Sequence, residues 1–230
     1  MKAVIFANGI MNQWPPGFEL SMDSDLIIAA DGGFNNCRQW NVMPHVIVGD
    51  MDSVNPSDLT EHGHGEIEIH RFPAKKDETD LHLALQMAID RNAGEIVILG
   101  ALGARWDMTF SNVFILATPF LHGVDVRILE GRYELLCLHG HNKINLVGKP
   151  GNIVSLIPLA GPATGVTLAG FEFSLDKETL PVGTTRGISN LFKDKKAEIE
   201  IEGGHLLVVI DRKYENRKHS CQAFRTRNLI

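Results

Sequence analysis

Short apolar runs alternate with helical stretches along the first 130 residues of the chain. The runs are apolar on both faces, as in parallel strands covered by helices on each side. Residues 79–92 place their apolar side chains on one helical face, with Thr79 as the N-cap. Residues 108–121 predict a second, more apolar helix, which we expect to be buried. The expected strands lie at 3–7, 26–30, 46–48, 67–69, 96–99 and 124–129.

From about Tyr133 onward the helical pattern ends and short strand-like segments follow one another. Turn signals such as Lys149-Pro150-Gly151 separate them, which is typical of an antiparallel β-sandwich or barrel. About 90 residues make a small core, so we expect this half to pack against something else. The segments lie at 133–138, 143–147, 153–159, 165–168, 184–192, 197–201 and 206–210.

The predicted fold is therefore an α/β domain followed by a second, all-β domain. Residues 1–132 are expected to form a doubly wound, mostly parallel, Rossmann-like sheet. Residues 133–230 are expected to form a C-terminal antiparallel β-sandwich. The basic tail after residue 210 is interpreted as a solvated end.

Composition narrows the class of protein. The chain has 230 residues, 44% of them hydrophobic and 22% charged, as in an ordinary globular protein. A net charge of −6 argues against nucleic acid or an anionic membrane as partner, and no apolar run reaches the roughly 18 residues of a membrane span. Neither a secretion signal nor a CxxC pair is present, and the three cysteines are odd in number and far apart. We therefore expect a reduced, cytoplasmic protein.

The segment after the third expected strand carries two aspartates, Asp50 and Asp52, behind Gly49 and before Ser53. In extended chain, side chains two positions apart point the same way, so both carboxylates can converge on one cation. Ligands of open α/β sheets sit beyond the carboxyl ends of the strands. Mg²⁺ takes one or two protein carboxylates and completes its shell with water and substrate phosphate. Taken alone, the pattern fits a magnesium site and an aspartate-rich turn equally well.

The second expected strand ends in Asp31, Gly32 and Gly33. The two glycines permit a close approach of backbone to a ligand and can open a helix with free N–H groups. A structural turn explains this segment nearly as well when it is taken alone.

Two further segments carry charges at the edge of the same sheet. Residues 75–80 read Lys-Lys-Asp-Glu-Thr-Asp directly before the first expected helix; acidic residues there are partly ordinary capping, but Asp77 and Asp80 exceed what a cap requires. Residues 100–107 read Gly-Ala-Leu-Gly-Ala-Arg-Trp-Asp and match neither GxGxxG nor Walker A. Arg105 suits a phosphate, or a surface pair with Asp107.

Taken together, four strand ends of one predicted sheet bring acidic and basic side chains to one crevice. An acidic pocket with basic residues at its rim is typical of a metal–nucleotide phosphate site.

The ordered motifs DGG, GDxDS, KDxTD and GxxGxRxD, followed by an all-β half, resemble the thiamine pyrophosphokinase family over nearly the whole chain to about residue 210. The resemblance implies transfer of pyrophosphate from Mg·ATP to the hydroxyl of thiamine, giving thiamine diphosphate and AMP. It also implies a homodimer, with each active site where the α/β domain of one copy meets the β domain of the other.

The resemblance assigns roles by motif. Asp50, Asp52 and Asp80 are expected to bind Mg²⁺, and these residues with Asp31 form the catalytic set. The expected ATP contacts are Gly32, Gly33, Lys76, Asp77, Thr79, Gly103 and Arg105. The expected thiamine contacts are Asp107, Thr109, Ser189 and Asn190. Met108 departs from the His or Gln that the family often has, and residues 203–208 lack the tryptophan that some members place there.

Other readings of the same residues stay open. Asp50 and Asp52 also fit the DxDx[TV] motif of haloacid-dehalogenase-type phosphatases, although that motif follows a first strand. The same pair fits the DxD of metal-dependent glycosyltransferases or another nucleotide-dependent transferase. A nucleotide-sensing module without catalysis is the rival from another class. None of these alternative functions accounts for both Asp31 and Asp80.

Overall fold

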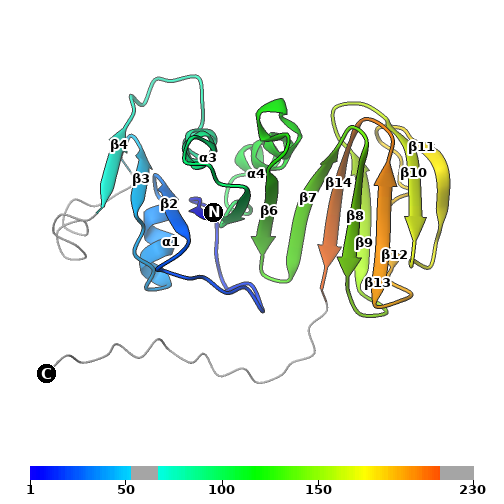
Figure 1. Cartoon of the computed structure of the whole chain (residues 1–230). Helices are drawn as coiled ribbons and strands as arrows, with labels where there is room; N and C mark the ends of the chain where they lie inside the picture. Colours follow the sequence, from blue (N-terminus) through cyan, green and yellow to red (C-terminus); the bar gives the residue numbers. More distant parts are fainter. Residues whose placement is uncertain (53–66, 213–230) are drawn as a thin grey trace, which may run out of the picture.

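The computed structural model describes residues 1–52 and 67–212. A ten-stranded sheet runs through both halves of the chain, and a four-stranded sheet covers part of it (Figure 1). The strand order of the large sheet is β12-β9-β14-β7-β6-β5-β1-β2-β3-β4, and that of the small sheet is β11-β10-β13-β8. The predicted fold class is confirmed.

The elements have the following bounds. The large sheet contains β1 (Lys2–Phe6), β2 (Leu26–Ala30), β3 (Val46–Gly49), β4 (Glu68–Arg71), β5 (Glu95–Leu99), β6 (Asp125–Glu130), β7 (Tyr133–His139), β9 (Ile153–Pro158), β12 (Asn190–Leu191) and β14 (His205–Asp211). The small sheet contains β8 (Asn142–Val147), β10 (Ala163–Ala169), β11 (Leu175–Leu180) and β13 (Lys196–Ile201). The helices are α1 (Gly33–Gln39), α3 (Asp80–Asp90) and α4 (Trp106–Phe114), followed by the 3₁₀ turns η1 (Ile115–Ala117) and η2 (Pro119–Leu121).

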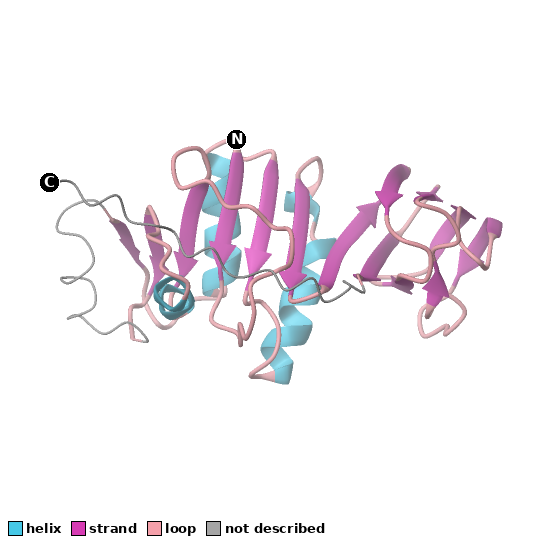
Figure 2. Cartoon of the chain, turned by 90° about the horizontal axis from the view of Figure 1, so that it is seen from below, coloured by secondary structure: helices cyan, strands magenta, loops and turns pink. Residues whose placement is uncertain are grey.

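The six strands of the α/β half are all parallel, in the order β4-β3-β2-β1-β5-β6. The chain therefore reverses its direction of travel between β1 and β5, which is the switch point where open sheets bind ligands. Figure 2 shows these strands side by side with helices on both faces. The side chains of β1 explain why: Ala3 and Ile5 pack in the core on the α3 side, and Val4 and Phe6 in the core on the α1 side.

The antiparallel pairing of β7 with β6 carries the sheet into the β half. Alternate residues of β7 serve two cores, since Leu135 packs with the α/β core while Leu136 and Leu138 pack inside the β-sandwich. The boundary expected at residue 132 falls in the tight turn between these two strands. The division into two domains stays a prediction. The hydrogen bonds between β6 and β7 cross the expected boundary within one sheet.

Two expected elements are wrong in part. The helix expected at 108–121 ends at Phe114, and two 3₁₀ turns follow because Pro119 cannot continue a helix. It is also not buried: Asn112 is its one buried residue, while Phe110 and Phe114 are 58% and 52% exposed. Of the strand expected at 184–192, only Asn190–Leu191 forms a regular strand, and Phe192 adds an isolated antiparallel bridge to Phe171.

Two elements were not expected, α1 and β11. Helix α1 begins at Gly33 behind the N-cap Gly32, and a glycine inside a helix usually weakens it. The sequence of β11, Leu-Asp-Lys-Glu-Thr-Leu, has polar residues at its four central positions, and the structure buries its two terminal leucines.

Some expectations concern residues that lie outside the described ones. Ser53 of the aspartate motif, Cys221 and the basic tail beyond residue 212 are among them. No helix in the described ranges, 1–52 and 67–212, has the length and apolar character that a membrane crossing requires.

Candidate functional site

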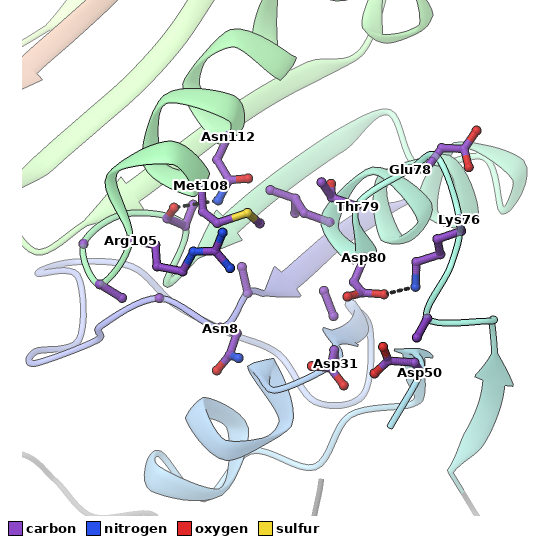
Figure 3. Close-up of a pocket in the computed structure, with 18 residues that line it drawn as sticks. Asn8, Asp31, Asp50, Lys76, Glu78, Thr79, Asp80, Arg105, Met108 and Asn112 are labelled. Carbon is purple, nitrogen blue, oxygen red and sulfur yellow. Dashed lines mark hydrogen bonds and ion pairs between the residues drawn. The ribbon is translucent and has the colours of Figure 1, made fainter. Parts of the chain in front are cut away.

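A cavity of about 330 Å³ opens at the carboxyl ends of β1, β2, β3 and β5, where the sequence motifs cluster (Figure 3). Loops after these strands form its floor, and the first turns of α3 and α4 form its walls. Its lining includes Asp31, Asp50, Lys76, Thr79, Asp80, Gly103 and Arg105 of the expected site. The four motifs thus meet in one place, as the parallel topology predicted.

Two loops at the switch point are joined by backbone contacts. The N–H of Gly9 after β1 donates to the carbonyl of Gly100 after β5 at 2.7 Å. A side chain at position 9 would stand 2.4 Å from that carbonyl oxygen, so only glycine fits. The buried amide of Asn36 in α1 donates to the carbonyls of Ala7 and Gly9 at 2.7 and 3.0 Å. These contacts fix the floor of the pocket.

Asp31 adopts a left-handed backbone conformation, φ 43°, directly after β2. Its N–H donates to the carbonyl of Val48 at 2.7 Å, and its carbonyl accepts from Phe34. Gly49 allows this approach, because a Cβ there would lie 2.8 Å from the Asp31 Cβ. The side chain is buried, and its Oδ1 has no hydrogen-bond partner within residues 1–52 and 67–212. An orphaned buried carboxylate oxygen is costly and marks a place for a ligand.

Asp50 lines the cavity, whereas Asp52 does not. The Asp50 Oδ1 accepts the backbone N–H of Asp52 at 3.0 Å, and Met51 between them has φ 70°. This local turn breaks the extended chain that was expected, so the two carboxylates no longer share a face. The expected metal role of Asp52 is not tested by this geometry and stays a prediction.

The start of α3 contributes the basic and acidic wall of the pocket. Thr79 is the N-cap, as the sequence predicts, and its hydroxyl accepts the N–H of His82 at 3.3 Å. Asp80 follows at the first helical position, and its carboxylate accepts from Lys76 Nζ at 2.5 Å. Figure 3 shows the carboxylates of Asp31, Asp50 and Asp80 gathered on one side of the pocket. Asp77 is exposed and does not line the cavity.

Arg105 and Asp107 form an exposed ion pair at the other side of the pocket. This contact raises the pKa of the Arg105 guanidinium and lowers the pKa of the Asp107 carboxyl. Arg105 lines the cavity and Asp107 does not. Thr109 caps the same loop, because its hydroxyl donates to the carbonyl of Gly103 at 3.1 Å.

Gly32 and Gly33 are buried at the start of α1 and lie outside the pocket lining. A Cβ on Gly33 would lie 1.9 Å from the carbonyl oxygen of Phe6, and a Cβ on Gly32 would lie 2.2 Å from the Asn8 amide. Both glycines therefore let α1 pack closely against β1. Their expected ATP contacts remain a prediction beside this packing role.

Ser189 and Asn190 lie far from the pocket within one chain. They sit at β12, at the opposite end of the sheet order, with four strands between it and β5. At about 4.8 Å per strand this separation is roughly 24 Å. The Asn190 amide is used within its own half, accepting the N–H of Phe173 at 3.0 Å and donating to its carbonyl at 2.7 Å.

The pocket also contains three residues to which the sequence assigned no role, Asn8, Glu78 and Asn112, together with Met108, the departure from the family pattern. Asn112 is buried, and its amide donates to the carbonyl of Ala101 at 2.7 Å, which ties α4 to the loop after β5. The sequence did contain one indication of this role, because Asn112 is a polar residue in a mostly apolar helical segment. Asn8 and Glu78 gave no signal beyond lying next to strand ends and motifs.

The lining of the pocket is acidic. Four carboxylates, those of Asp31, Asp50, Glu78 and Asp80, face two cationic side chains, Lys76 and Arg105, for a net charge of −2. Clustered carboxylates repel one another, so the pocket favours a bound cation. Oxygen donors of this kind suit a hard divalent cation such as Mg²⁺.

Several solved structures share this fold. The crystal structure of thiamine pyrophosphokinase from Bacillus subtilis superposes with a TM-score of 0.82 at 22% identity, over 93% of this chain and 100% of that one. Thiamin pyrophosphokinase from Candida albicans gives a TM-score of 0.74 at 16% identity, over 92% and 89% of the two chains. These likenesses show the fold.

The sequence comparisons go further. The chain is 24% identical over 210 residues to thiamine pyrophosphokinase of Bacillus subtilis, covering 91% of this chain and 98% of the relative. It is 26% identical over 220 residues to thiamine pyrophosphokinase 1 of Oryza sativa subsp. japonica, covering 84% and 83%. The thiamin pyrophosphokinase catalytic domain family matches residues 19–128, and its vitamin B1 binding domain family matches residues 141–206. Because the two matches together span most of the chain, it belongs to the thiamin pyrophosphokinase family and is an enzyme with thiamine pyrophosphokinase activity.

Proposed function

We propose that the pocket at the carboxyl ends of β1, β2, β3 and β5 is where this chain transfers pyrophosphate from ATP to thiamine. The observation that carries the proposal is the convergence of Asp31, Asp50 and Asp80 on one cavity that also holds Lys76 and Arg105. A phosphatase or sugar transferase needs the Asp50 and Asp52 pair but gives no role to Asp31 and Asp80.

A divalent cation fits the donor set of the pocket. The lining carries a net charge of −2, and Asp31 Oδ1 is buried without a partner in the part of the chain that the structure describes. We assign Mg²⁺ to Asp50 and Asp80. Asp52 lies outside the lining of the cavity, and its metal role stays the one that the family resemblance implies. When bound, the ion neutralises charge on the transferring phosphates. Lys76 forms an ion pair with the Asp80 carboxylate and also lines the cavity in which we expect the phosphates to bind.

The transfer itself requires one bond to form and one to break. The hydroxyl oxygen of thiamine bonds to the β-phosphorus of ATP, and the bond to the oxygen that bridges to the α-phosphorus breaks. AMP leaves, and thiamine diphosphate forms. The hydroxyl proton passes late in the transfer to a nearby carboxylate, and we assign it to Asp31 because of its unpartnered buried oxygen. Such chemistry depends on positioning and charge more than on covalent catalysis.

The basic residues around the cavity are assigned to the nucleotide. Lys76 and Arg105 offer ammonium and guanidinium donors to phosphate oxygens, and Thr79 offers a hydroxyl at the N-terminus of α3. Gly103 lines the same wall. Gly32, Gly33 and Asp77 keep the nucleotide roles that the sequence predicts, at positions adjoining the pocket.

We further propose that two copies of the chain complete each site. Asp107 and Thr109 border the pocket, but Ser189 and Asn190 are roughly 24 Å from it across the sheet. All four can contact one thiamine only if the last two come from a second copy. The positive thiazolium of thiamine is attracted by the acidic lining.

An exposed apolar stripe on α4 supports this dimer. Trp106, Phe110 and Phe114 are spaced four residues apart, lie on one face of α4 and are 76%, 58% and 52% exposed. A cluster of large apolar side chains in water marks an interaction surface. Because α4 begins at the pocket, a partner that covers this face also reaches the site.

We place this activity in the cytoplasm, where ATP is available and thiols stay reduced. Cys37 and Cys137 are free thiols. Burial raises the pKa of the Cys37 thiol well above its usual range and that of Cys137 to about 12. Neither thiol is therefore reactive at neutral pH.

The direct test is the product of the reaction. Purified chain incubated with ATP, Mg²⁺ and thiamine should release AMP and thiamine diphosphate in equal amounts, with no AMP when thiamine is omitted. Chromatography of the nucleotides measures both. Absence of AMP, with phosphate released from monoesters instead, would favour the phosphatase.

The carboxylates of the pocket are tested by charge removal. Asp50→Asn and Asp80→Asn should each lower AMP formation by about a thousandfold or more, since an uncompensated phosphate charge raises the barrier by several kcal/mol. Asp90→Asn is the matched control, because Asp90 ends the same helix as Asp80 and is exposed. Circular dichroism should show all three variants folded. Full turnover in either pocket variant would contradict the metal assignment.

A further inference from the structure

Three histidines meet at the edge of the large sheet opposite the carboxylate pocket. His122 follows η2 and precedes β6, His139 ends β7, and His205 begins β14. Since β7 runs antiparallel to β6, its end lies beside the beginning of β6, away from the pocket. The length of one strand, roughly 20 Å, therefore separates this histidine cluster from the phosphate site.

The three rings face one another. His139 and His205 are direct cross-strand partners in the pairing of β7 with β14. Their ring centroids are 5.4 Å apart, and those of His122 and His139 are 4.6 Å apart. One nitrogen from each of the three rings lies within 4.8 Å of the others. Within residues 1–52 and 67–212, no other three His, Cys, Asp or Glu side chains bring their ligand atoms within this distance of one another.

The surroundings of His139 leave one of its ring nitrogens without a protein partner. Its Nδ1 is buried and has no hydrogen-bond partner among the residues described. A neutral imidazole nitrogen is the form that binds a metal ion.

We propose that His122, His139 and His205 bind one divalent transition metal ion of the zinc class. Imidazole nitrogens prefer such ions over Mg²⁺, which takes oxygen donors. At a metal–nitrogen distance near 2.0–2.1 Å, tetrahedral ligands stand about 3.3 Å apart, so the rings need a modest closure. His122 is exposed on a turn and can make that movement by rotating its side chain. Water completes the fourth position.

The bound ion ties together segments from both halves of the chain. His122 belongs to the connection that leads into the last parallel strand of the α/β half, and His139 and His205 belong to the β half. Binding to the folded state alone stabilises that state. The site therefore acts as a structural link across the seam, remote from the phosphate chemistry.

The experiment measures zinc binding to the full chain. Protein without an affinity tag is stripped with a chelator, placed in excess Mg²⁺ so that the carboxylate pocket is occupied, and titrated with Zn²⁺ against a chromophoric competitor. One equivalent should bind tightly and raise the Tm. His122→Ala should weaken this binding at least tenfold and abolish the rise in Tm, because one of three ligands is lost. His122 is chosen because its side chain is exposed, so replacing it with alanine should leave the fold intact.

The control is His70→Gln, which removes a half-buried histidine paired with Glu68 on the edge strand β4 and should leave zinc binding unchanged. Loading with Co²⁺ provides a second readout, since imidazole ligation in a four- or five-coordinate site gives visible absorption bands that His122→Ala and His205→Ala should lose. Failure of the wild-type chain to bind one equivalent would overturn the proposal. The proposal would also be overturned if His122→Ala and His205→Ala bound zinc with the same affinity as the wild type, whatever their effect on AMP formation.

Discussion

The α/β half and the β half position their polar side chains in different ways. In the α/β half, parallel strands end at one edge, so motifs separated by more than 70 residues, from Asp31 to Arg105, meet in one cavity. In the β half, antiparallel strands end alternately at both edges. Ser189 and Asn190 lie at β12, while His139 and His205 lie together at the edge far from the pocket.

This difference supports the proposal that two copies of the chain complete each site. A parallel sheet gathers residues within one chain, and an antiparallel sheet brings together only residues near the same strand ends. The expected thiamine residues of the β half can therefore join the pocket only from another copy. The α/β half also leaves aromatic side chains of α4 exposed.

The largest expected effect comes from mixing two inactive variants. Asp50→Asn removes a carboxylate of the α/β half, and Ser189→Trp places a bulky ring on an exposed position of the β half. Each variant alone should be nearly inactive. After unfolding and refolding together, random pairing should restore about a quarter of wild-type AMP formation, because half the dimers carry one intact site.

The control for the mixing experiment is a double variant with both changes in one chain, refolded with itself. It should remain inactive. If the mixed single variants also remain inactive while forming dimers in light scattering, the site is not shared between copies.

A smaller but still large effect concerns packing at the start of α1. Gly33→Ala forces a Cβ to within 1.9 Å of the Phe6 carbonyl oxygen, so backbone must move. We expect the free energy of unfolding to fall by about 2–4 kcal/mol in urea titrations. Gly94→Ala, at a position with open space, should change it little. Normal stability of Gly33→Ala with weakened ATP binding would make this glycine a ligand contact instead.

The seam between the halves provides a pH-dependent test. Glu130 ends β6, and burial raises the pKa of its carboxyl from 4.5 to about 7. The folded state is thus penalised when this group ionises, so its contribution to stability is full below pH 4.5 and is lost as pH rises through 7. Glu130→Gln should be more stable than wild type at pH 8 by about 1–2 kcal/mol, after allowance for solvent screening of this half-buried group.

Thermal unfolding at pH 8 and at pH 4.5 checks this effect. The advantage of Glu130→Gln should shrink at pH 4.5, where the wild-type carboxyl is protonated in the folded state. An equal advantage at both pH values would show that the effect does not come from ionisation.

The smallest effect is expected at the N-cap of α3. Thr79→Ala removes the acceptor of the His82 N–H and should cost about 1 kcal/mol of unfolding free energy. It should also raise the KM for ATP, since Thr79 lines the pocket. Thr185→Ala, an exposed threonine before β12, should change neither quantity. An unchanged unfolding free energy would exclude a stabilising cap.

Much of the α/β half was predictable because its strands are continuous apolar runs and its helix α3 has a clear cap at Thr79. Where the pattern was weaker, the prediction failed for physical reasons. Helix α1 begins with Gly33, which local propensity disfavours but which the close packing on Phe6 of β1 requires. The exposed aromatic side chains of α4 were interpreted as a buried face, because apolar periodicity alone does not distinguish a core from an interface.

The site was predictable where it depended on strand ends and not where it depended on side-chain direction. Asp31, Asp50 and Asp80 line one cavity because of topology. Asp52 leaves it because Met51 turns the chain. The histidine cluster had no local signal at all, since its members are separated by 17 and 66 residues in the sequence and meet only through the pairing of β7 with β14.

The position of β14 within the large sheet also constrains the order of assembly. It lies between β7 and β9 and pairs with both, although it is the last strand of the described chain. During synthesis the sheet therefore remains split, with unpaired edges on β7 and β9, until residues 205–211 have emerged. The α/β half can fold early on the ribosome, but the sandwich closes only after β14 is available to pair with β7 and β9.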